Sequence, residues 1–160
     1  MDVTEKGELM TEETVLCRVR AASREEALRL AADRLTRDGY VRDGFCQALL
    51  ERERKFPTGI CLGSVCVAIP HAEPGYVRTP ALLVMTLEEP VDFVNMEDCD
   101  HEIPVRMIFV LAFTDGEKHL NVLQQLSALI RDARTVERLL EADTDRELYQ
   151  ILRESPLKEF

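Results

Sequence analysis

The sequence of 160 residues has no uninterrupted apolar run of the roughly 18 residues that a membrane-spanning helix needs. Its first residues, Met1 to Lys6, also lack the basic segment followed by an apolar one that is typical of a secretory signal peptide. We therefore expect a cytosolic protein that does not insert directly into a membrane.

Basic residues are scarce relative to acidic ones. The 20 lysines and arginines stand against 30 aspartates and glutamates, which gives a formal net charge of −10 at pH 7. Nucleic acids and anionic membrane surfaces are polyanions and would repel such a chain. The charge therefore argues against nucleic acid as the main partner.

The chain also lacks C-x-x-C pairs and a G-x-x-x-x-G-K-[ST] loop for binding ATP phosphates. Its cysteines are odd in number and are interpreted as small buried side chains, with a redox or metal role as the alternative: Cys17, Cys46, Cys61, Cys66 and Cys99. His101 lies in an acidic segment, but without helical or strand spacing to other candidate ligands. We predict no metal site and no bound cofactor.

The composition is that of one ordinary domain. With 46% hydrophobic residues and no internal repeat, low-complexity segment or linker, the chain is expected to form a single domain over 1–160. Its core is expected at about 14–153, with loose termini at 1–13 and 155–160.

Apolar runs predict strands at 14–19, 65–69, 81–87 and 103–113, and the last of these, the most hydrophobic, is expected at the centre of the sheet. A loop is expected at 58–64, and Glu88-Glu89-Pro90 is expected to close the third strand before an irregular segment at 91–102. Several connections are too short for parallel crossovers. The fold predicted is α/β (α+β), a mixed parallel and antiparallel sheet of about five strands flanked by helices.

Helix starts are indicated by capping residues. Ser23 with Glu26 and Thr114 with Glu117 form capping boxes, and Gly39 is a left-handed stop for the first helix. A second helix is expected to begin at Asp43 and end before Pro57, and two further helices to begin at Thr135 and Thr144.

Two histidines and an arginine are the candidate chemical groups. His71 follows a buried strand directly behind Pro70, and His119 lies in the first turn of a helix and faces its buried side. Arg52 lies near the end of the second helix, where Arg54 is an alternative. A neutral imidazole is a competent nucleophile, and arginine and a helix N-terminus both stabilise phosphate. Each histidine can equally be a hydrogen-bonded structural residue.

In this setting the sequence resembles the enzyme IIA components of the bacterial phosphoenolpyruvate-dependent sugar phosphotransferase system, of the fructose/mannitol type (type 2). The residues that carry the resemblance are Arg52-Glu53, Pro57-Thr58-Gly59, Val67-Ala68-Ile69-Pro70-His71, and His119-Leu120 followed by Leu123, Leu126 and Leu129. The spacing of Phe56-Pro57-Thr58-Gly59-Ile60 is most like that of the galactitol-specific IIA proteins.

The resemblance implies that His71 is phosphorylated by the histidine-containing phosphocarrier protein (HPr) and passes the phosphoryl group to a cysteine of a cognate IIB component, with a membrane IIC component downstream. It implies that His119 stabilises His71 or its phosphate and that Arg52 neutralises the phosphate. Thr58 and Gly59 would support the phosphate loop, although Thr58 can instead cap the turn.

Two alternatives stay open at this point. The chain can be a regulatory module like the nitrogen-type IIA relatives, whose phosphorylation state controls protein binding. Neither the sugar nor the oligomeric state follows from the sequence. Docking of two partners would also need apolar groups around His71, for which Ile60, Leu62 and Tyr76 are candidates.

Overall fold

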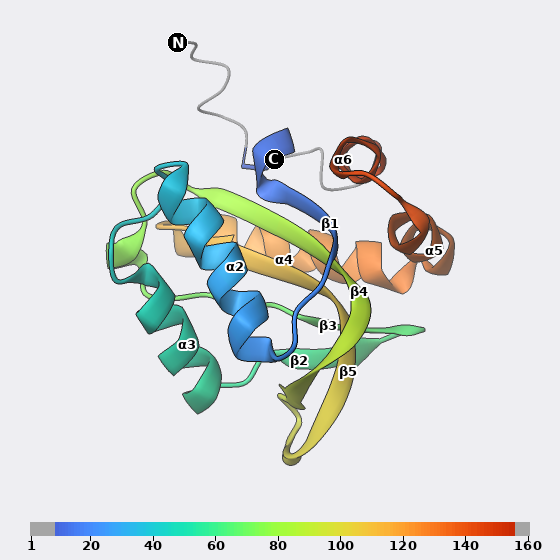
Figure 1. The fold of residues 1–160 in the computed structure, drawn as a ribbon, viewed down its shortest axis with the longest axis horizontal. Helices are drawn as coiled ribbons and strands as arrows, with labels where there is room; N and C mark the ends of the chain where they lie inside the picture. The colour runs from blue at the N-terminus through green and yellow to red at the C-terminus, as the bar shows by residue number, and fades with distance from the viewer. Residues whose placement is uncertain (1–8, 156–160) are drawn as a thin grey trace.

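The computed structural model describes residues 9–155, whereas 1–8 and 156–160 lie outside the described part (Figure 1). The expected loose termini therefore fall partly outside it. Within it, Leu9 and Met10 are buried, and the carbonyl of Leu9 accepts a hydrogen bond from the N–H of Leu82. A short 3-10 turn, η1 (Glu12–Thr14), follows. Leu9 and Met10 are therefore packed within the segment that was expected to be loose, whereas Glu12 and Glu13 are exposed.

Five strands of the described chain form one mixed sheet (Figure 1). β1 (Val15–Val19) runs parallel to β4 (Ala81–Asn95), and β4 pairs antiparallel with β5 (Asp98–Ala112). β5 runs parallel to β3 (Val65–Ala68), which pairs antiparallel with β2 (Gly59–Leu62). Gly59 also pairs with Asn95 at the end of β4, so the sheet curls back on itself. The predicted mixed five-stranded sheet is confirmed.

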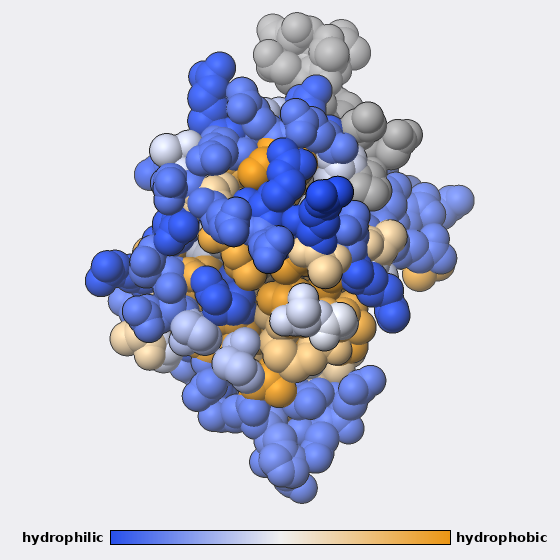
Figure 2. All heavy atoms as spheres, turned by 90° about the vertical axis from the view of Figure 1, so that its right-hand side faces the viewer, coloured by the Kyte–Doolittle hydropathy of each residue, from blue (hydrophilic) through white to orange (hydrophobic). Residues whose placement is uncertain are grey.

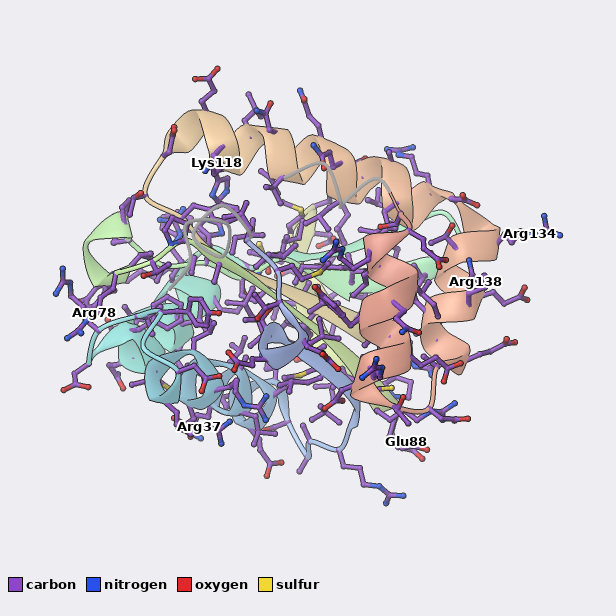
Figure 3. The ribbon with its side chains drawn as sticks, turned by 90° about the horizontal axis from the view of Figure 1, so that it is seen from above. Arg37, Arg78, Glu88, Lys118, Arg134 and Arg138 are labelled. Carbon is purple, nitrogen blue, oxygen red and sulfur yellow. A yellow bond between two sulfur atoms is a disulfide. The ribbon has the colours of Figure 1, made fainter. Side chains whose placement is uncertain are left out.

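Helices cover both faces of the sheet, as the view from above shows (Figure 3). One layer holds α2 (Arg24–Arg37) and α3 (Phe45–Lys55), and the other holds α4 (Gly116–Arg131), α5 (Ala133–Glu141) and α6 (Asp145–Arg153). Alternation along β4 sends Leu83 into the core under α2 and α3, and Leu82 into the core under α4 to α6. This explains the unbroken apolar run of β4.

Local signals place most helix starts correctly. Ser23 caps α2, Thr144 caps α6, and Gly39 has a φ of +84° just beyond α2. The second helix, α3, begins at Phe45 after Gly44, not at Asp43.

The caps of the next two helices also differ from the prediction. In α4 the carboxylate of Asp115, not Thr114, accepts the N–H of Glu117. α5 begins at Ala133, two residues before Thr135, and the hydroxyl of Thr135 donates to the carboxylate of the preceding N-cap residue, Asp132.

Two strand boundaries differ from the prediction. Residues 59–62 form a strand that turns at Gly63, where φ is +62°, and so make a β-hairpin with β3. β4 does not end at Pro90: the register shifts between Thr86 and Val91, so the missing N–H falls at an irregularity. Beyond it the buried side chains of Val91 and Phe93 keep the strand on the core, and the expected irregular segment is the tip of a long hairpin.

The cysteines are not uniformly buried. Cys61 and Cys66 lie opposite each other in the β2–β3 hairpin and form a disulfide, and Cys61 and Cys99 are exposed. Alternation along β2 packs Ile60 and Leu62 against the core and turns Cys61, between them, outward. The interpretation as buried side chains is therefore wrong for these positions. Cys17 and Cys46 are half-buried, and burial raises the pKa of both thiols.

Figure 2 shows the face toward which the hairpin turn and α5 project. Apolar side chains gather in the middle of this face, and polar ones surround them. A hollow of about 380 Å³ there lies between Ser64 of the turn and Val136 and Leu140 of α5. Across residues 9–155, none of the helices has the length and apolar character needed to cross a membrane.

Candidate functional site

His71 stands at the carboxyl edge of two parallel strands. β3 ends at Ala68, and the chain then follows β5 closely: the N–H of Leu111 donates to the carbonyl of Pro70 at 3.0 Å, and His71 forms a bridge with Leu111. α4 begins at Gly116, soon after β5 ends. Because parallel strands end at the same edge, His71 and the N-terminus of α4 lie side by side.

A pocket of about 140 Å³ opens at this edge. Three predicted site residues, Arg52, His71 and His119, line it together. The remaining lining comes from the segment after His71 and from the β5–α4 connection: Ala72, Glu73, Pro74, Leu111, Phe113, Thr114, Asp115 and Gly116. The structure thus brings together groups from α3, the end of β3 and α4.

The two imidazole rings meet edge to face. Their centroids are 5.1 Å apart with an interplanar angle of 75°, and the ring of Phe113 packs at 90° against His119 on another side. Nδ1 of His71 lies 3.3 Å from the carbonyl oxygen of Ile69. A neutral ring that donates its Nδ1–H to this carbonyl keeps the lone pair of Nε2 free.

Both histidines are held in the neutral form. Burial is the main reason that the pKa of His71 is lowered, and the charge of Arg52 lowers it further, while the Ile69 carbonyl and Glu73 act in the opposite direction. Burial likewise lowers the pKa of His119, and it is lowered further by the positive charge that His71 carries when protonated and by the charge of Arg52. Neutral imidazole is the nucleophilic form, so the pocket favours acceptance of an electrophile at pH 7.

Arg52 reaches the pocket with its guanidinium partly engaged. Nη1 lies 3.4 Å from a carboxylate oxygen of Glu73, and the group lies over the ring of Phe56 at 4.9 Å. Nε is buried without a hydrogen-bond partner among the described residues. Arg54 instead lines a different pocket, with Arg24 and Glu25. Of the two arginines, only Arg52 lines the pocket that holds His71 and His119.

Thr58 and Gly59 do not line the pocket. The N–H and hydroxyl of Thr58 both donate to the carboxylate of Glu53, each at 2.9 Å, and its hydroxyl oxygen accepts the N–H of Ile69 at 3.0 Å. Gly59 faces β4 so closely that an added Cβ would meet the carbonyl oxygen of Val94 at 2.7 Å. Only glycine fits there.

Glu53 is the residue at this site that sequence reasoning missed. Its side chain is only 6% exposed, and burial raises its pKa to about 7 against the lowering effect of the two bonds from Thr58. The one sequence signal was its place directly after Arg52. A run of charged residues at a helix end is normally exposed to solvent, so the sequence did not indicate that Glu53 is buried.

His101 and the apolar groups proposed for docking lie elsewhere. His101 is exposed and bonds Asp98 at 2.7 Å, and within residues 9–155 no three His, Cys, Asp or Glu side chains are grouped to hold a metal ion. Ile60, Leu62 and Tyr76 are only half-buried and pack against the two cores. Two exposed apolar side chains adjoin residues of the pocket: Phe56, at 60%, whose ring contacts the Arg52 guanidinium, and Leu120, at 55%, which follows His119 in α4.

Comparisons with known proteins agree on one family. Residues 8–155 match the family described as "Phosphoenolpyruvate-dependent sugar phosphotransferase system, EIIA 2". A fructose-specific EIIA component from Haloferax volcanii is 31% identical over 158 residues, which cover 96% of this chain and 98% of the relative. A nitrogen regulatory protein from Pseudomonas aeruginosa is 30% identical over 149 residues, 91% of this chain and 92% of the relative.

A galactitol-specific EIIA component from Escherichia coli is 28% identical over 117 residues, 73% of this chain and 77% of the relative. Among solved structures, the complex of enzyme IIAMTL and phosphorylated enzyme IIBMTL from Escherichia coli matches with a TM-score of 0.74 and 26% identity, over 91% of this chain and 99% of that chain.

Proposed function

The chain belongs to the EIIA type 2 family of the phosphoenolpyruvate-dependent sugar phosphotransferase system, and from this premise we propose that it carries a phosphoryl group on His71 during sugar uptake. His71 receives the group from HPr and transfers it to a cysteine of a cognate IIB component. The observation that carries the proposal is the pocket in which His71, His119 and Arg52 meet.

The geometry suits an in-line transfer to Nε2 of His71. The lone pair of Nε2 forms the new N–P bond as the bond to the donor nitrogen breaks, and Nδ1 keeps its proton for the carbonyl of Ile69. Transfer onward to the IIB cysteine breaks the N–P bond at Nε2 and returns its lone pair. Neither step needs a bound nucleotide.

Two neighbours stabilise the charge on the phosphoryl group. The guanidinium of Arg52 offers a planar donor fork, and its unpaired Nε supports this role. The first N–H groups of α4, at Gly116, present the positive end of a 16-residue helix to the same pocket. The ring of His119, edge-on to His71, donates to or orients the phosphoryl group.

Phe56 and Leu120 form an apolar rim on which partners dock. Phe56 lies under the guanidinium of Arg52 and Leu120 follows His119, so an acceptor or donor that covers the pocket buries both. The solved complex of enzyme IIAMTL with phosphorylated enzyme IIBMTL supports a IIB protein as one such partner.

The test is phosphorylation with phosphoenolpyruvate, enzyme I and HPr. The chain has 3 histidines, which allows a matched set of variants. We expect wild type and His101→Ala to take up one phosphoryl group per chain and His71→Ala to take up none. Full labelling of His71→Ala would reject the assignment.

A regulatory role is the second candidate, and the Pseudomonas aeruginosa relative supports it. Here the phosphorylated and unphosphorylated forms would differ in the protein that they bind. Restoration of sugar uptake together with matching IIB and IIC components would favour transport, whereas phosphorylation-dependent binding to a kinase or transporter without sugar-dependent dephosphorylation would favour regulation. Galactitol as the sugar stays a prediction, because the fructose-specific relative is similar over more of the chain.

A further inference from the structure

A continuous set of hydrogen bonds links the end of α3 to the ring of His71. The carboxylate of Glu53 accepts both the N–H and the hydroxyl of Thr58, the hydroxyl oxygen of Thr58 accepts the N–H of Ile69, and the carbonyl of Ile69 faces Nδ1 of His71. The first two residues are almost fully buried, each 6% exposed. None of these bonds uses a group that lines the pocket, apart from the ring itself.

The role of Thr58 follows from where its hydroxyl points. Its hydrogen goes to Glu53 and one lone pair of its oxygen receives the N–H of Ile69, so its single donor is already committed within the protein. This leaves no hydrogen of Thr58 for a phosphate. The hydroxyl instead fixes the amide side of Ile69, while Pro70 restricts the backbone on its other side.

That restraint decides the direction of the Ile69 carbonyl. A residue held at its N–H and followed by proline has little freedom in φ and ψ, so its carbonyl stays aimed at Nδ1 of His71. The carbonyl only accepts hydrogen bonds, so it favours the tautomer that carries the proton on Nδ1. The nucleophilic lone pair is then on Nε2.

Glu53 anchors Thr58, and through it Ile69, to the end of α3. It is buried in the last turns of the helix, next to Arg52, and no other described acceptor bonds Thr58. The two carboxylate oxygens of Glu53 each accept one donor from Thr58, whereas a glutamine side chain has an NH2 donor in place of one of these acceptor oxygens.

We propose that Glu53 and Thr58 are positioning residues that hold the backbone before His71 so that its ring keeps the Nδ1–H tautomer and presents Nε2 to the phosphoryl donor. The inference rests on the proposed function of His71, but its ring tautomer is measurable without any phosphoryl donor. Neither residue touches the phosphoryl group. Their effect passes through Ile69 alone.

The experiment compares Thr58→Val, which keeps the shape and removes the hydroxyl, with Thr58→Ser, which keeps the hydroxyl. The ring nitrogen shifts of His71 are measured by ¹⁵N NMR in the unphosphorylated protein, and phosphoryl uptake from HPr is then timed. We expect wild type and Thr58→Ser to hold the Nδ1–H tautomer. Thr58→Val should populate the Nε2–H tautomer and take up phosphoryl roughly 10- to 100-fold more slowly.

Glu53→Gln serves as the second variant if Thr58→Val does not fold, and it should change the tautomer in the same direction. An unchanged His71 tautomer in a folded variant, or a defect that serine does not restore, would overturn the positioning role. Absence of phosphoryl uptake by wild type would instead reject the proposed function, and the tautomer comparison would still decide the positioning role.

Discussion

Within residues 9–155, the ring of His71 has a hydrogen-bond partner at Nδ1 and none at Nε2. Its Nδ1 faces a backbone carbonyl and the ring is half-buried, so burial and Arg52 both favour the neutral form. The sequence singled out this residue through a short string that follows a strand. It did not predict which nitrogen is free, because that depends on the direction of one carbonyl set by side chains elsewhere.

The first prediction concerns pH. Since the pKa of His71 lies below its ordinary value of 6.5, the ring stays neutral at pH values at which a free histidine is half protonated. We expect phosphoryl uptake to change little as pH falls from 8 to 6.5, and to decline only below that. An NMR titration of the His71 ring should give a midpoint below 6.5, and a midpoint above it would contradict the account.

The second prediction separates the two arginines. Arg52 lines the pocket and Arg54 does not, although they are two residues apart on one helix. Arg52→Lys keeps the charge but removes the planar fork, so we expect phosphoryl uptake to slow by about 10-fold or more. Arg54→Lys is the matched control and should behave as wild type. Equal rates for the two variants would show that neither guanidinium contacts the phosphoryl group.

At the scale of elements, the end of α3 is where sequence reasoning was least informative. A run of charged residues at a helix end is normally solvated, yet Glu53 is buried among them and accepts two hydrogen bonds from Thr58. Pro90 likewise resembled a strand end, and only the pairing of β4 with β5 shows that the strand continues. In both cases tertiary contacts overrode a correct local rule.

The third prediction follows from the buried carboxyl of Glu53. Its folded-state pKa of about 7 lies above the ordinary value of 4.5, so its contribution to stability is fully present below pH 4.5 and is lost as pH rises toward 7. Removing the titration in Glu53→Gln should therefore flatten the dependence of the free energy of unfolding on pH.

Between pH 4.5 and pH 7, the free energy of unfolding of wild type should fall by on the order of 3 kcal/mol more than that of Glu53→Gln. Urea denaturation at pH 4.5 and at pH 7 measures it. Glu51→Gln, at an exposed position of the same helix, controls for the loss of one acidic residue. If the free energy of unfolding changes equally with pH in wild type and Glu53→Gln, the buried carboxyl of Glu53 does not titrate in this range.

At the scale of the whole molecule, the predicted architecture was confirmed because apolar runs and helix caps are local signals. The site that joins His71, His119 and Arg52 depends on the topology. β3 and β5 are parallel neighbours, and the end of α3 is held next to them by the hydrogen bond between Glu53 and Thr58. The resemblance placed these three residues in one site. The exposed rim and the β2–β3 hairpin became visible only in three dimensions.

The fourth prediction concerns docking. Leu120 is exposed on α4 next to His119, and a partner that covers the pocket would bury it. Leu120→Asp should raise the HPr concentration needed for half-maximal uptake by about 10-fold, from lost apolar burial, without changing the melting temperature. Leu30→Asp, at an exposed leucine of α2 across the sheet from α4, is the control. If Leu120→Asp and Leu30→Asp raise the required HPr concentration equally, Leu120 is not part of the docking surface.

We propose Nε2 of His71 as the atom that accepts the phosphoryl group. The most direct measurement is NMR of the phosphorylated chain with ¹⁵N-labelled histidine, in which coupling to ³¹P identifies the bonded nitrogen. We predict coupling to Nε2 of His71, with Nδ1 still protonated. Coupling to Nδ1 of His71, or to either nitrogen of His119, would contradict the account.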